Sequence, residues 1–277
     1  MRFFKICKSF YKSGLLAIAV LTFRDISRQT LFYFILGVGC CLLFFSSFFT
    51  LFAFGEESRM IREMGISTIV LCCLCLASLS ATSTLFTERE QGTLVTLLCK
   101  PVAQRTILLG KFFGITGVIF FVCMFMGFFL SLAITIKGFP GDYRNFTTSL
   151  ISVAAFVFLK LLFSFLQVAI ICSIAILGSV CLPMVSNLGL CMVVYIVGNL
   201  TQSFYGIFQE NGNLSALFWF ILFFFSVIPN LSEFSNIESS FESVRFVTIA
   251  LMVLYTVLYV TFILTVACEL FEKKECS

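Results

Sequence analysis

TEREQGTLVTLLCKPVAQRTILLGK, residues 87–111, is the one long stretch of this 277-residue chain that combines charged residues, helix signals and a helix breaker. Apolar runs long enough to cross a bilayer lie on both sides of it. Thr87, with Glu90 three residues later, is typical of a helix N-terminus, where both side chains satisfy free backbone N–H groups. Pro101 cannot continue a helix. The stretch therefore predicts a short helix over residues 88–99, between two membrane spans.

The predicted helix is amphipathic. Its acidic residues, Glu88 and Glu90, fall at the positive end of the helix dipole. An apolar stripe follows at helical spacing and consists of Leu94, Leu97 and Leu98. Arg105 and Lys111 come just before the next apolar run, where long basic side chains reach the headgroup layer. Such a helix is too polar to span a membrane and too apolar to be a free loop.

The pattern resembles the cytoplasmic block between the second and third spans of type-2 ABC transporter permeases. That block contains Glu-x-x-x-Gly-Thr, a leucine stripe, Pro, a basic residue and Gly-Lys, and the matching positions here are Glu88, Gly92, Thr93, Leu94, Leu97, Pro101, Arg105, Gly110 and Lys111. IPNLSEFSN, residues 228–236, is similar to a Pro-Asn-x-x-x-Phe element before the last span in the multicopper-enzyme-maturation branch of that family. The alternative for the central block is an ordinary interfacial helix between two spans.

The resemblance implies a permease that works with a separate ABC ATPase subunit, on which ATP and Mg are bound. The residues that it implies for ATPase docking are Glu88, Glu90, Gly92, Thr93, Leu94, Leu97, Pro101 and Arg105. It also implies a second permease chain, identical or different, and export as the direction of transport. No cofactor is expected on this chain, which lacks a Gly-x-x-x-x-Gly-Lys-Ser/Thr phosphate loop.

Composition places the chain among integral membrane proteins. It is 60% hydrophobic and 12% charged, whereas soluble domains carry about 25% charged residues. It contains no His, the commonest general base and metal ligand. Cys72, Cys73 and Cys75 lie in an apolar run without acidic partners, so we interpret them as small hydrophobic residues rather than metal ligands. Basic residues form no sustained run, which indicates the lipid bilayer and not nucleic acid as a partner.

The apolar runs predict one all-α transmembrane domain over residues 1–277 with six spans. The spans are expected at residues 31–54, 66–86, 112–136, 161–182, 188–208 and 244–270. Residues 1–30 predict an amphipathic helix on the inner membrane face, since their apolar piece is too short to cross; a signal peptide is the alternative. The apolar residues 214–228 have the length of a re-entrant segment and are not counted as a span.

Polar and small residues inside the spans predict how the helices pack. The Ser-, Thr- and Ala-rich residues 78–84 should face other helices, and Gly114 and Gly117 should form a close-packing face. Lys160 either extends to the outer membrane boundary or faces a substrate path with Gln167 on the same helix face. Asn199 and Gln202 make the later half of the fifth span polar, and we count them as further candidates for that path.

Charge placement predicts the orientation. With six spans and a cytoplasmic N-terminus, the inner segments hold twelve basic residues and the outer loops five, as the positive-inside rule requires. Both termini and the central block are then cytoplasmic, in what we expect to be a bacterial inner (plasma) membrane. The alternatives to an ATP-driven permease are a secondary carrier or channel, or an integral membrane enzyme such as a lipid-modifying transferase or an intramembrane protease.

Overall fold

The computed structural model describes the backbone of residues 2–49, 57–90, 104–137, 146–210, 229–235 and 246–275, and side chains within the core of these ranges. Every element in the described residues is a helix, as the sequence predicts. The helices are α1 (Arg2–Arg28), α2 (Thr30–Phe49), α3 (Glu57–Glu90), α5 (Gln104–Lys137), α6 (Phe146–Cys181), α7 (Met184–Glu210), α9 (Ser232–Ser235) and α10 (Phe246–Glu275).

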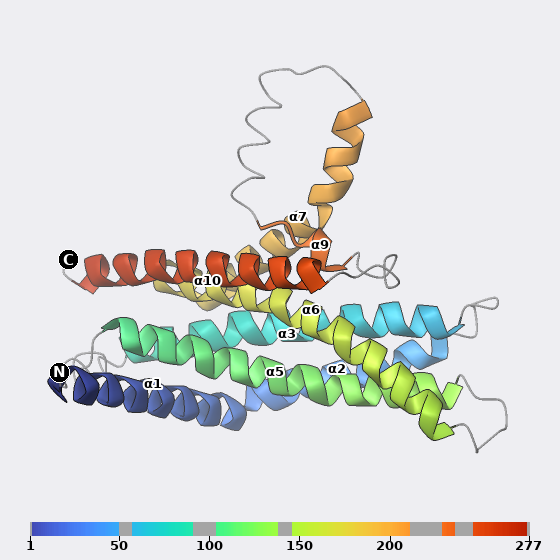
Figure 1. The fold of residues 1–277 in the computed structure, drawn as a ribbon, viewed down its shortest axis with the longest axis horizontal. Helices are drawn as coiled ribbons and strands as arrows, with labels where there is room; N and C mark the ends of the chain where they lie inside the picture. Colours follow the sequence, from blue (N-terminus) through green and yellow to red (C-terminus); the bar gives the residue numbers. More distant parts are fainter. Residues whose placement is uncertain are drawn as a thin grey trace.

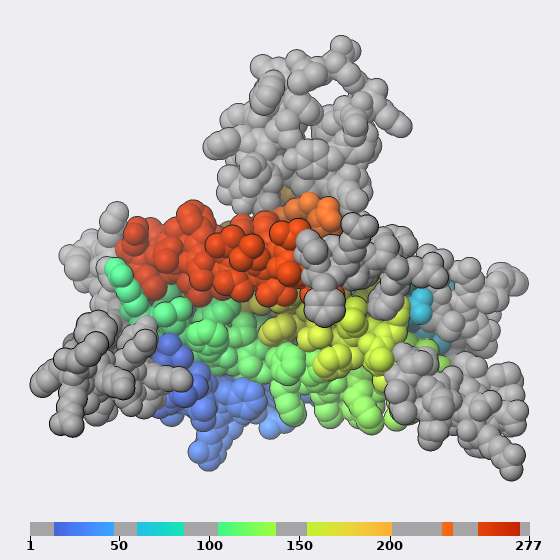
Figure 2. Space-filling model, in the orientation of Figure 1, coloured from blue at the N-terminus to red at the C-terminus, as the bar shows by residue number. Residues whose placement is uncertain are grey.

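Helices α3, α5 and α6 pack on one another and form the centre of an elongated bundle (Figure 1). Helices α1 and α2 cover one side of this centre, and α7 and α10 cover the other. The apolar part of α6 is 78% buried and that of α10 is 17% buried, so α6 is a core helix and α10 a peripheral one. In Figure 2, α10 lies lengthwise on the visible face, above α5 and α1. Both chain termini lie at the same end of the bundle (Figure 1).

Four helices among the described residues are long and apolar enough to cross a membrane, and a fifth crossing results if a bent pair of helices counts as one span. The four cover Met60–Leu85, Arg105–Ile136, Ala154–Cys181 and Ile249–Phe271. In α7 the apolar helix Met184–Leu200 is shorter, and the last part of α7 turns away from the bundle in Figure 1. Six spans therefore stay a prediction, and residues 214–228 lie outside the described residues.

The N-terminal helix is present but lies elsewhere than the sequence predicts. α1 bends by 65° into α2 and packs along α5 in the same direction, with Gly110 beside Ile18 and Gly114 beside Thr22. The prediction of a helix lying flat on the membrane face is wrong for this segment. Gly110 and Gly114 lack side chains, so α1 can approach the backbone of α5 closely, and this contact determines the direction of α1.

The glycine face of α5 gives a stability prediction. A Cβ on Gly114 would lie 2.7 Å from Thr22 Cβ and 2.8 Å from the Ala19 carbonyl oxygen, whereas a Cβ on Gly117 would meet its nearest atom, in Phe23, at 3.6 Å. We expect Gly114→Ala to destabilise the protein by about 1–3 kcal/mol, the cost typical of overpacking. The matched control Gly117→Ala should be neutral or slightly stabilising. Thermal unfolding of the purified full chain checks this, and equal Tm values for the two variants would contradict it.

The Ser- and Thr-rich half of α3 faces other helices, as predicted. Ser78 and Thr82 are fully buried, and Thr82 Oγ1 donates to the Ser78 carbonyl at 2.8 Å. Such bonds within the helix satisfy the hydroxyl groups in an apolar environment. Ser83 Oγ donates across to Gln29 Oε1 at 3.3 Å, at the bend between α1 and α2. The small polar residues thus allow close packing at little cost in unsatisfied polar groups.

Candidate functional site

Two of the predicted path residues meet inside the bundle. Gln167 of α6 is 3% exposed, and its Nε2 donates to Oδ1 of Asn199 in α7 at 3.1 Å. Asn199 Nδ2 in turn donates to the Tyr195 carbonyl one turn earlier at 3.0 Å. Amide groups in an apolar bundle are costly unless they are hydrogen-bonded, so this pair links α6 to α7 at a defined position.

The segment that contains the Pro-Asn-x-x-x-Phe element docks beside this pair. Leu231 is fully buried, and its N–H donates to the carbonyl of Gly198, the residue before Asn199, at 3.2 Å. On the other side, the Asn230 N–H donates to the Tyr255 hydroxyl of α10 at 3.3 Å, and the rings of Phe234 and Tyr255 lie 6.5 Å apart. The segment therefore connects α7 to α10.

The other two candidates for the substrate path are Lys160 and Gln202, and the described contacts do not join either of them to Gln167 or Asn199. Lys160 is half-buried on α6, two turns before Gln167 on the same face. Gln202 lies in α7, where the structure describes the backbone but not the side chain. α6 is a single helix from Phe146 to Cys181, so Lys160 lies within a continuous helix.

The central block differs from its prediction in its first turn. Thr87, Glu88 and Glu90 belong to the C-terminal end of α3, so the predicted helix start at Thr87, with Glu90 as a capping residue, is wrong. Five of the predicted docking residues, Gly92, Thr93, Leu94, Leu97 and Pro101, lie outside the described residues. Arg105 lies in the first turn of α5 and is exposed. The ends of α3 and α5 that flank the block lie at the same end of the bundle as both termini (Figure 1).

Lys111 has a role that the sequence does not predict. It is 4% exposed, and its Nζ donates to the Thr84 carbonyl in α3 at 3.1 Å, so it does not reach toward headgroups. Leu108 and Ile115 are buried on the same face of α5. Lys111 is three residues after Leu108 and four before Ile115, and this spacing could have predicted that its side chain is buried in the bundle. The contact fastens the start of α5 to the end of α3, the two helix ends that flank the central block.

Metal-ligating side chains do not gather in groups of three or more within the part of the chain that the structure describes. The ten cysteines whose side chains the structure describes are free thiols, among them Cys72, Cys73 and Cys75 of α3. Hydrogen bonds of the described polar side chains connect helices, as at Gln167 with Asn199 and at Lys111 with the Thr84 carbonyl.

Comparisons with known proteins identify the family. The family model described as ABC-2 family transporter protein matches residues 6–276, nearly the whole chain. The comparison with curated proteins found no match. A match of this extent agrees with the apolar helical bundle and with the resemblance of the central block. The chain therefore belongs to the ABC-2 transporter family and is an integral membrane permease component of an ABC transporter.

Proposed function

We propose that this chain forms the substrate path of an ATP-driven exporter and is moved by a separate ATPase subunit that docks on the block between α3 and α5. The observation that carries the proposal is the family match over residues 6–276, together with the position of this block. α3 ends and α5 begins at the end of the bundle where both termini lie (Figure 1), which agrees with a cytoplasmic location for all three.

The docking surface that we propose contains Glu88, Glu90, Gly92, Thr93, Leu94, Leu97, Pro101 and Arg105. ATP and Mg would be bound by the ATPase, and the permease chain would hold neither. A second permease chain, identical or different, would complete the transporter in a bacterial inner membrane. The Pro-Asn-x-x-x-Phe segment supports the multicopper-enzyme-maturation branch as the nearest part of the family.

The described contacts give a physical route for the coupling. A displacement of the block acts on α3 and α5 together, because Lys111 joins their ends through its bond to the Thr84 carbonyl. α3 and α5 both pack on α6, which carries Gln167. Movement at the docking surface can thereby change the contact between Gln167 and Asn199.

We place the substrate path along α6 and α7 and assign to it Lys160, Gln167, Asn199 and Gln202. The support is the Gln167–Asn199 hydrogen bond, which puts amide groups from both helices at one level of the bundle. The docked segment with Leu231 lies directly beside this level, since Leu231 is bonded to Gly198.

Co-purification tests the ATPase assignment. The tagged full chain, extracted from membranes in a mild detergent, should bring down an ABC ATPase subunit, because an intact docking surface binds it. A triple variant with Glu88, Glu90 and Leu94 replaced by Ala should insert to the same level and lose the ATPase. A triple variant of exposed residues on α1, Arg24, Asp25 and Arg28, controls for the removal of charged side chains from another surface of the chain.

A wild-type chain that inserts normally and brings down no ATPase would contradict the proposal and favour the carrier or channel. Retention of the ATPase by the triple variant would contradict the docking surface alone and leave the family assignment in place.

A further inference from the structure

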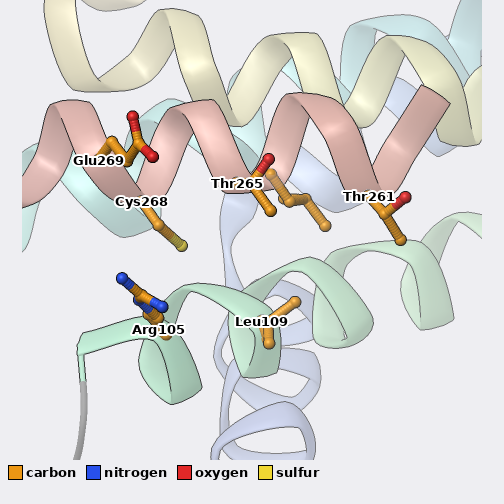
Figure 3. Close-up of a pocket in the computed structure, with 7 residues that line it drawn as sticks. Arg105, Leu109, Thr261, Thr265, Cys268 and Glu269 are labelled. Carbon is orange, nitrogen blue, oxygen red and sulfur yellow. The ribbon is translucent and has the colours of Figure 1, made fainter. Parts of the chain in front are cut away.

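A groove lies between the start of α5 and the end of α10 (Figure 3). Its volume is about 360 Å³, within the range of small-molecule sites. Arg105 and Glu269 lie at one end, and Leu109, Leu264 and Thr261 line the rest. The groove lies at the periphery of the bundle, because α10 is the least buried of the four long apolar helices.

The groove changes from charged to apolar along the bundle axis. α5 and α10 run antiparallel here, so Arg105 is opposite Glu269, and Leu109 is opposite the preceding turns of α10 (Figure 3). The hydroxyl groups of Thr261 and Thr265 donate to carbonyls of their own helix, at 2.9 Å to Val257 and 2.7 Å to Phe262. These bonds satisfy the hydroxyls locally, so the groove gains little polarity from the threonines.

The ends of the candidate spans indicate that the charged end of the groove lies near the boundary between hydrocarbon and headgroups. Arg105 is the first residue of one candidate span, and Glu269 lies two residues before the end of another, Phe271. A cation at that depth meets phosphate groups, and the apolar remainder of the groove extends toward the hydrocarbon. A groove with a charged end and an apolar remainder is complementary to an amphiphile whose long axis is parallel to the membrane normal.

We propose that the groove binds one phospholipid with a zwitterionic headgroup of the phosphoethanolamine kind. Arg105 binds the phosphate, and an acyl chain lies along Leu109 and Leu264. With Arg105 and Glu269, the charged end of the groove carries one positive and one negative group. This pair suits a headgroup with an ammonium beside its phosphate better than an anionic headgroup. The lipid would fasten α10, which packs mainly on α6, to α5.

Lipid binding by the purified full chain, without an ATPase, tests this proposal by native mass spectrometry. Phosphatidylethanolamine should bind more tightly than phosphatidylglycerol with the same chains, and diacylglycerol and free phosphoethanolamine should not bind. Arg105→Gln should weaken phosphatidylethanolamine binding by about tenfold or more, because bonds to charged groups are the strong ones. Arg24→Gln, an exposed arginine on α1, is the control and should leave binding unchanged.

Thr265→Trp provides a second variant, since it fills the groove without changing its charge. It should also abolish binding, whereas Thr265→Ser should not. Equal binding of diacylglycerol, tighter binding of phosphatidylglycerol, or full binding by both Arg105→Gln and Thr265→Trp would overturn the proposal. Because the readout needs no ATPase, failure of the lipid site and failure of the docking surface remain distinguishable.

Discussion

Replacing Gly198 by Ala is expected to release residues 229–235 from α7. A Cβ at position 198 would lie 2.7 Å from Leu231 Cδ1 and 3.0 Å from the backbone carbonyl oxygen of Pro229. A rotamer change of Leu231 can relieve the first contact but not the second, because the second involves backbone. Separation of the two segments would also break the 3.2 Å bond from the Leu231 N–H to the Gly198 carbonyl. We estimate the cost at about 1–3 kcal/mol, as for other overpacked sites.

Hydrogen exchange of the full chain in nanodiscs measures this effect. In Gly198→Ala the amides of residues 230–235 should exchange about tenfold faster, since 1.4 kcal/mol is a factor of ten in an opening equilibrium. Gly189→Ala is the matched control on the same helix, because no atom lies within 4 Å of its added Cβ. Unchanged exchange in Gly198→Ala would mean that the segment does not depend on its contact with α7.

The sequence predicts the features of the fold that depend on local composition. Apolar length identifies the long helices, and the clustering of Ser, Thr and Ala in residues 78–84 identifies the packed face of α3. The close-packing face of α5 is confirmed at Gly114, where α1 leaves no room for a side chain. These features follow from the size and polarity of residues in one segment, so no knowledge of distant contacts is needed.

The predicted helix start at Thr87 is wrong because the same residues can begin a helix or continue one. Thr87 and Glu90 form a capping pattern, but the same residues are compatible with a helix interior. Between Ser78 and Glu90 there is no Gly or Pro to end α3, and the first breaker is Gly92. α3 also packs on α5 and α6, which favours continuation. Tertiary packing thus outweighs the cap.

The sequence identifies the polar residues of the candidate site but does not predict which of them contact each other. Gln167 and Asn199 each stand out as polar residues in apolar runs, but they are 32 residues apart, and only the packing of α6 on α7 brings them together. Likewise, the sequence of α1 does not predict that this helix packs against Gly110 and Gly114 of α5. Contacts between distant segments need the assembled bundle.

Lys111→Met is expected to uncouple the docking block from the bundle without unfolding the protein. Lys111 is 4% exposed, so its charge carries a desolvation cost of several kcal/mol. The bond to the Thr84 carbonyl, at 3.1 Å, is one of the contacts that offset this cost. Met has a similar length and carries no charge to desolvate, so the variant should unfold close to the wild-type temperature. It cannot, however, hold the end of α3 to the start of α5.

Lys111→Met should therefore reduce the response of the permease to ATP without lowering its thermal stability. In the complex that we propose between this permease and an ATPase subunit, adding ATP should alter hydrogen exchange along α3 and α6 in the wild type, and most of this change should be absent in Lys111→Met. Leu108→Met, a buried swap of similar volume one turn earlier on the same face, should keep the full ATP response. A full ATP response in Lys111→Met would mean that the block moves the bundle without this bond, and a large fall in Tm would mean that Lys111 is a structural residue. The expected combination, a stable chain that no longer responds to ATP, means that Lys111 transmits displacement between α3 and α5, where its Nζ is bonded to the Thr84 carbonyl at 3.1 Å.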